Sequence, residues 1–144
     1  MTQTRVKHEI LTAYLPAYFH ILKGRNENLI YIDAFAGRGT YTKATNGKTV
    51  SGSPLRALKL IARRDDFSKV VTPVFIESDP ILFTWLEEAV NKFYRKHGQI
   101  RQPLCLQGTF KQHVQEIMEA VDGKLAPTFL FVDPCGVNGT SFRT

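Results

Sequence analysis

This sequence of 144 residues has little of what builds covalent or metal-stabilised scaffolds. Its two cysteines, Cys105 and Cys135, form no Cys-x-x-Cys pair and no cluster with histidine. This pattern indicates neither a disulfide framework nor a zinc site, and we predict no metal site. No apolar stretch approaches the roughly 20 residues of a membrane span, and the N-terminus lacks the apolar core of a signal peptide. These absences predict a cytoplasmic protein that does not enter a membrane.

Acidic residues are also in deficit. Thirteen Asp and Glu stand against nineteen Lys and Arg, which gives a net charge of +6. A positive surface suits a polyanionic partner such as nucleic acid. A solvated basic surface without a partner explains the same charge equally well. The length predicts one domain, residues 1–144, that is large enough to bury a core.

Helical and strand patterns alternate along the chain. Apolar spacing predicts a leading helix at about 4–23, which Pro16 should kink or divide. Apolar runs predict strands at 29–35, 70–77, 100–108 and 126–133, separated by helices that begin near Ser53, Asp79 and Thr109. We expect Ser53 to be an N-cap, and Ser78 or Asp79 to be another. Strands and helices in this order predict a parallel α/β sheet with right-handed crossovers.

Three further expectations concern the long loop, one helix and one strand. Residues 36–54 are rich in Gly, Thr and Lys, which predicts a loop, and its basic part, with Lys43 and Lys48, could cover a cleft or follow a phosphate backbone. A mobile surface insertion is an equally good interpretation. In the helix after Asp79, we expect Trp85 to face the core with its apolar neighbours. Cys105 should behave as a small buried hydrophobe.

Chemically capable residues follow the strands. Open parallel sheets bind ligands beyond the carboxyl ends of their strands, so these residues should converge on one cleft. They are Asp33, Phe35, Gly37 and Gly39 after the first strand, Glu77 after the second, Gln107 and Thr109 after the third, and Asp133 with Pro134 after the fourth.

The acids at 33 and 77 favour one cofactor over another. Gly37 and Gly39 let a ligand approach the backbone, but Thr42 stands where a dinucleotide fingerprint needs its third glycine. The anionic Asp33 would repel a pyrophosphate and could hold the amino group of a methionine-type ligand. Glu77 could accept hydrogen bonds from both ribose hydroxyls, each worth on the order of 1.5–3 kcal/mol. We therefore predict S-adenosyl-L-methionine rather than a nicotinamide cofactor.

The Asp133-Pro134 pair has a chemical use. The amine of a nucleic-acid base is a poor nucleophile because its lone pair is delocalised into the ring. The Asp133 carboxylate and the Pro134 carbonyl could accept the hydrogens of that amine, localising the lone pair and aiming it at an electrophilic methyl group. A simple strand-terminating turn is the alternative. A methyl-accepting role for the Cys135 thiol is conceivable, although no base lies beside it in the sequence.

Together these segments resemble class I S-adenosylmethionine-dependent methyltransferases. YIDAFAGRGTY is similar to their first motif, FIESDP to the second-strand acid, and LFVDPCG to the fourth-strand motif. More narrowly, the leading helix, YIDAFAGRG, GSPLRAL, FIESDP and FVDPCG resemble the three-Cys-motif partner family over nearly the whole chain. The tetrapeptide DPCG also resembles the Asp-Pro-Phe-Gly of tRNA guanine-N2 methyltransferases, which indicates an amino group on a base as the acceptor.

The resemblance implies a Rossmann-like α/β fold of the class I methyltransferase type and a radical-type three-Cys-motif partner protein. It also implies catalytic roles for Asp133 and Pro134 and a cofactor site at Asp33, Gly37, Gly39 and Glu77. Complete class I folds have seven strands, so we expect a sheet truncated after the fourth strand. Its open edge predicts a homodimer. A non-catalytic cofactor-binding or partner-binding module remains the alternative to an enzyme.

Overall fold

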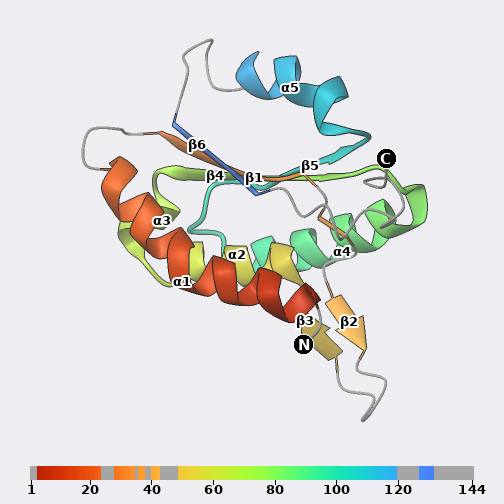
Figure 1. Cartoon of the computed structure of the whole chain (residues 1–144), viewed down its shortest axis with the longest axis horizontal. Coiled ribbons are helices and arrows are strands. Elements are labelled where there is room, and N and C mark those ends of the chain that lie inside the picture. Colours follow the sequence, from red (N-terminus) through yellow and green to blue (C-terminus); the bar gives the residue numbers. More distant parts are fainter. Residues whose placement is uncertain are drawn as a thin grey trace.

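The computed structural model describes residues 3–23, 28–34, 36–37, 40–42, 49–119 and 127–131 (Figure 1). Helices and strands alternate through most of this part of the chain. In order, they are α1 (Gln3–Lys23), β1 (Leu29–Asp33), β2 (Thr40–Thr42), β3 (Thr49–Ser51), α2 (Ser53–Ala62), α3 (Asp65–Ser68), β4 (Val71–Glu77), α4 (Pro80–Lys96), β5 (Leu104–Gln107), α5 (Phe110–Glu119) and β6 (Thr128–Phe131).

Four strands form one parallel sheet in the order β5-β4-β1-β6. Each strand pairs in parallel with its neighbour, with Leu29 opposite Val71 and Val74 opposite Leu104. Counted along the chain without the short β2–β3 pair, this is the order 3-2-1-4 of a Rossmann-type half-sheet. The predicted Rossmann-like α/β fold is therefore confirmed for the described residues.

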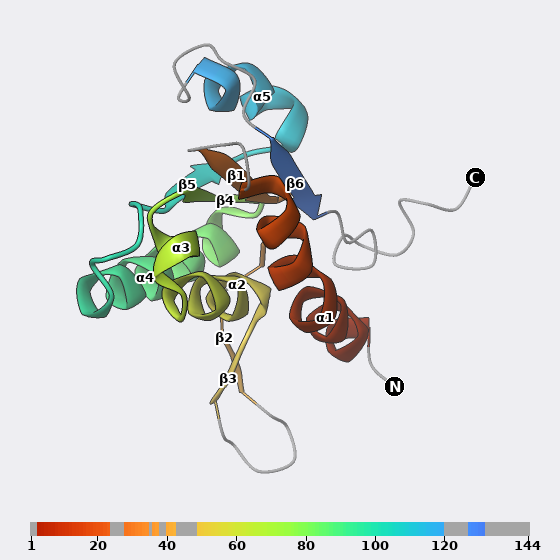
Figure 2. The same cartoon turned by 90° about the vertical axis from the view of Figure 1, so that its left-hand side faces the viewer.

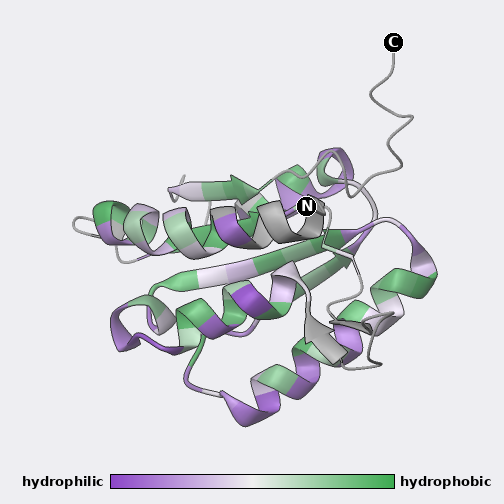
Figure 3. Ribbon diagram, turned by 60° about the horizontal axis from the view of Figure 1, so that its bottom comes forward, coloured by the Kyte–Doolittle hydropathy of each residue, from purple (hydrophilic) through white to green (hydrophobic). Residues whose placement is uncertain are grey.

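Helices cover both faces of the sheet. Figures 1 and 2 show α1, α2 and α4 on one face and α5 on the other. Alternate residues of β1 point to opposite faces, so Tyr31 packs in the core under α1, α2 and α4, while Ile32 packs in the core under α5. Figure 3 shows mostly apolar strands packed between helices of mixed hydropathy. This layering predicts that the strand ends, rather than the faces, are available to ligands.

Two local predictions were wrong, and for Pro16 one of the two predicted alternatives, division of the helix, is excluded. The loop predicted at 36–54 contains an antiparallel pair, β2 with β3, in which Thr40 lies opposite Ser51; β-branched residues suit strands, and the glycines and lysines around them hid the pattern. α1 continues through Pro16 without being divided. The N-cap of α2 is Gly52 rather than Ser53, because the Ser53 side chain has a different partner, described below.

Trp85 was predicted to face the core, but it is exposed. It is 50% exposed, and Ile81, one turn earlier on α4, is 70% exposed. The stripe that α4 buries runs through Leu86, Val90 and Phe93. Because successive helical residues are separated by about 100°, Trp85 points away from a stripe centred on Leu86.

No helix in the described ranges is long and apolar enough to cross a membrane.

Cys105 lies in β5, where burial, reinforced by the nearby Glu87, raises the pKa of its thiol to about 12. At pH 8 only about one in ten thousand such thiols is a thiolate, against about a quarter of ordinary thiols.

We therefore expect iodoacetamide to label Cys105 at least about 100-fold more slowly in the native protein than in urea. Peptide mapping by mass spectrometry in a Cys135→Ser variant measures this rate at Cys105 alone. Equal rates in the two solvents would contradict the burial of this thiol.

Candidate functional site

Polar residues gather where β1, β4 and β5 end. Asp33 closes β1, and in the sheet register Glu77 of β4 lies opposite Gln107 of β5. Among the predicted site residues that the structure describes, Asp33, Gly37, Glu77, Gln107 and Thr109 all follow or end these strands. Parallel strands place their carboxyl ends at the same sheet edge, so this edge is the candidate site. Phe35, Gly39, Lys43, Lys48, Asp133, Pro134 and Cys135 lie outside the described residues.

A direct hydrogen bond joins the glycine turn after β1 to the acid after β4. The Gly37 amide donates to Glu77 Oε1 over 2.9 Å, and the neighbouring Ala36 amide donates to the Ile76 carbonyl over 3.0 Å. Gly37 has φ 73°, a left-handed conformation that glycine adopts without strain. The turn is thus held against β4, with Gly37 over the carboxylate.

The Glu77 carboxylate is half-buried and organises the edge around it. Its second oxygen, Oε2, accepts a hydrogen bond from the Asp79 amide over 2.8 Å. A carboxylate has about four acceptor positions, and these two backbone bonds use two of them. Counting the bonds between described residues alone, Glu77 can therefore accept hydrogen bonds from two further donors, such as a pair of ribose hydroxyls, without releasing the turn.

Asp79 is the N-cap of α4, which confirms one of the two predicted alternatives, Ser78 or Asp79. Its Oδ1 accepts hydrogen bonds from the amides of Ile81 and Leu82, at 2.8 Å and 3.1 Å. These are donors at the helix start that have no partner within the helix. The cap places the first turn of α4 directly after Glu77, at the same edge of the sheet.

Asp33 is the buried anchor of the edge. It has no exposed surface, and the Ser53 hydroxyl donates to Asp33 Oδ2 over 2.7 Å. Burial, and secondarily the charge of Asp33, raise the pKa of the Tyr31 hydroxyl well above its usual value. Since Ser53 is the first residue of α2, this bond fixes the start of α2 to the end of β1. The predicted contact of Asp33 with the amino group of a ligand stays a prediction.

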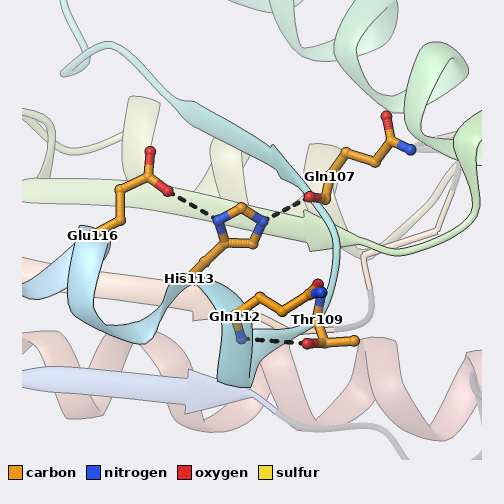
Figure 4. A network of polar contacts seen from close by, with 5 residues as sticks. All are labelled: Gln107, Thr109, Gln112, His113 and Glu116. Atoms are coloured by element: carbon orange, nitrogen blue, oxygen red, sulfur yellow. Dashed lines mark hydrogen bonds and ion pairs between the residues drawn. The ribbon is translucent and has the colours of Figure 1, made fainter.

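The end of β5 leads into α5 through a capping box (Figure 4). The Gln112 amide donates to Thr109 Oγ1 over 3.3 Å, and the Thr109 amide donates to Gln112 Oε1 over 2.8 Å. Thr109 thus has a structural role that its predicted place in the ligand cleft did not anticipate. The Gln107 side chain is exposed and points away from this network (Figure 4).

His113 completes this network, and sequence reasoning missed it. Its Nε2 donates to the Gln107 carbonyl over 2.6 Å, and its Nδ1 lies 2.9 Å from Glu116 Oε2. The Glu116 carboxylate, and then the Gln107 carbonyl, raise the pKa of the imidazole above its usual value. The His-x-x-Glu spacing on a helix was a visible signal for the Glu116 contact, but not for the Gln107 contact.

Within the described ranges, no group of three or more His, Cys, Asp or Glu side chains could hold a metal ion. The described groups around Glu77 are hydrogen-bond acceptors and backbone donors. Such a set suits a ligand that has hydroxyl or amino groups.

Comparisons with known proteins give the fold. No family model matches the chain, and a search of curated proteins finds no significant match. Among solved structures, protein LPL1258 from Legionella pneumophila, described by the family model DUF519, is similar with a TM-score of 0.63 and 16% sequence identity. The match covers 94% of this chain and 57% of that one, so the chain spans a little over half the length of this neighbour. At this identity the likeness supports the α/β fold alone.

Proposed function

We propose that this chain binds S-adenosyl-L-methionine as part of a methyltransferase that acts on an amino group of a nucleic-acid base. The observation that carries the proposal is the Gly37–Glu77 hydrogen bond. It joins a close-approach glycine turn to an acid that retains acceptor capacity, at the ligand-binding edge of a Rossmann-like sheet.

In this proposal the chain's own residues divide the work of holding the cofactor. Glu77 accepts hydrogen bonds from the ribose hydroxyls, and the Gly37 turn, with Phe35 and Gly39, lies along the methionine part. Gln107 and Thr109 lie on the adenine side, and Asp33 holds the start of α2 through Ser53. When bound, the cofactor supplies an electrophilic methyl group.

The acceptor side of the proposal rests on the sequence. Asp133 and Pro134 follow Phe131, the last residue of β6, which pairs with Asp33 in the sheet. Their carboxylate and carbonyl oxygens accept the hydrogens of a base amine, and the protein acts mainly by positioning the two reactants. A base in a duplex has to be flipped out of its stack to reach these groups.

The proposed partners follow from charge and topology. A net charge of +6 favours a DNA or RNA substrate. A three-Cys-motif partner protein remains a proposal from the resemblance, and a cytoplasmic location remains a proposal from the N-terminal sequence. In the described sheet β6 is an edge strand, and its Leu130 side chain is 42% exposed, which supports a homodimer through this edge. Light scattering that finds a monomer at high concentration would rule that dimer out.

The decisive test is calorimetric titration of the full chain with S-adenosylhomocysteine. We expect binding, and a loss of affinity of about 30-fold in Glu77→Gln, because an amide offers a weaker acceptor to the ribose than a carboxylate. Glu88→Gln, at an exposed position of α4 away from the edge, is the matched control and should bind like the wild type. Absence of binding would overturn the proposed cofactor, and equal affinity in Glu77→Gln would overturn the role of Glu77.

A non-catalytic module would bind the cofactor equally well, and turnover distinguishes it from an enzyme. The enzyme transfers a labelled methyl group to bulk RNA or DNA, and Asp133→Ala abolishes that transfer. Cofactor binding without transfer to any nucleic acid favours the module.

A further inference from the structure

We propose that His113 is a positioning residue that couples protonation on α5 to the geometry of the ligand-binding edge through the peptide group between Gln107 and Gly108. The coupling itself concerns this chain's own hydrogen bonds. Its effect on ligand affinity rests on the proposed function.

The geometry of one peptide group carries the proposal. Its carbonyl, from Gln107, accepts the Nε2 hydrogen bond of His113 at 2.6 Å. Its amide, from Gly108, donates to the Glu77 carbonyl at 2.9 Å. Hydrogen bonds on the two sides of an amide polarise it and strengthen each other. His113 is thus one peptide group away from the backbone of the acid that faces the ligand.

The path continues to the first strand. Glu77 accepts the Gly37 amide with its side chain, so the connected groups run from α5 through β5 and β4 to the turn after β1. The imidazole lies close to this path: a Cβ atom added to Gly108 would lie 2.7 Å from His113 Nε2. A change in the hydrogen bond of Nε2 therefore acts directly on the peptide group between Gln107 and Gly108.

Protonation decides how many of these bonds His113 can donate. The ring faces two acceptors: the charged Glu116 carboxylate from α5 and the uncharged Gln107 carbonyl from the end of β5. An imidazolium donates to both, whereas a neutral imidazole has one N–H and must leave one of them without a donor.

The sign of the pH dependence follows from these bonds. Both acceptors raise the pKa of His113, with Glu116 as the larger cause. The two bonds are therefore complete below the ordinary histidine pKa and are lost in part as the pH rises through the raised value. By linkage, a ligand that needs the ordered edge binds more weakly above that pKa, and its binding raises the pKa further.

The experiment is an NMR titration of the full chain that follows the His113 ring nitrogens together with the Gly108 and Gly37 amides. We expect the signals of the His113 ring, the Gly108 amide and the Gly37 amide to share one midpoint, above the ordinary pKa of histidine. In Glu116→Gln the three midpoints should fall together. In His113→Gln the new side-chain amide can donate at every pH. The backbone amide signals of Gly108 and Gly37 should then not change with pH. The control, His97→Gln at the C-cap of α4, should leave all three midpoints unchanged.

Two results would overturn the coupling: a Gly37 or Gly108 midpoint that differs from that of His113, or backbone amides that still titrate in His113→Gln.

Affinity for S-adenosylhomocysteine should fall about tenfold between pH 6 and pH 9 in the wild type and stay constant in His113→Gln. A pH-independent affinity would overturn the effect on the ligand. Shared midpoints without binding at any pH support the coupling and overturn the proposed cofactor instead.

Discussion

Gly108→Ala is expected to lower the free energy of unfolding by about 3 kcal/mol, through backbone strain and the loss of local hydrogen bonds. Gly108 has φ 134°, a conformation that residues with a Cβ rarely adopt. The added Cβ would lie 2.6 Å from Gln112 Oε1 and 2.7 Å from His113 Nε2. Both side chains would have to move, so the capping box of α5 and the bond to the Gln107 carbonyl would be disturbed together.

Urea unfolding followed by circular dichroism measures this effect, and Gly98→Ala is its matched control. A Cβ on Gly98 would have the Tyr94 carbonyl oxygen as its nearest contact, at 3.9 Å. Gly98 also has no positive φ, so alanine there should leave stability unchanged or raise it by up to about 1 kcal/mol. Similar losses in the two variants would contradict the account of Gly108.

Ser53→Ala is expected to lower the free energy of unfolding by about 2–3 kcal/mol, in the upper part of the range of about 1.5–3 kcal/mol for hydrogen bonds to charged groups. The Ser53 hydroxyl donates to a carboxylate that has no exposed surface. Removing it takes a hydrogen-bond donor from a buried charge that water does not solvate. The start of α2 would then lose a side-chain tie to the end of β1.

Ser68→Ala is the control for this prediction. Ser68 is also buried, but its hydroxyl donates to the uncharged carbonyl of Asp65 over 3.2 Å, so alanine there should cost about 1 kcal/mol. A double-mutant cycle isolates the bond: in an Asp33→Asn background, Ser53→Ala should cost less than in the wild type. Additive losses at Asp33 and Ser53 would show that the two side chains do not stabilise each other.

Much of the fold could be predicted from local patterns. Continuous apolar runs identified β1 and β4 because strands in a parallel sheet are buried on both faces. The prediction of 70–77 for the second strand differs from the observed Val71–Glu77 by one residue. Asp79 and Pro80 marked the start of α4, since the donors of a first helical turn need a nearby side-chain acceptor. The alternation of the elements, with right-handed crossovers, predicted the parallel sheet.

The same reasoning brought Gly37, Glu77, Gln107 and Thr109 to one edge, because parallel strands end on the same side. It could not say how they meet. The bond from Ser53 to Asp33 spans 20 residues, and a serine before a proline at a helix start has the pattern of an N-cap. Only packing α2 against β1 decides that its hydroxyl turns to the buried carboxylate.

The sequence by itself thus determined the elements, their order and the edge at which polar residues collect, since these depend on periodicity and on side chains near one another in the chain. Tertiary structure alone decided that Trp85 is exposed, that Glu77 holds the Gly37 turn, and that His113 binds a carbonyl of β5. In the last two contacts one partner is a backbone group. Every residue carries such groups, so no pattern of side chains can show which of them will be used.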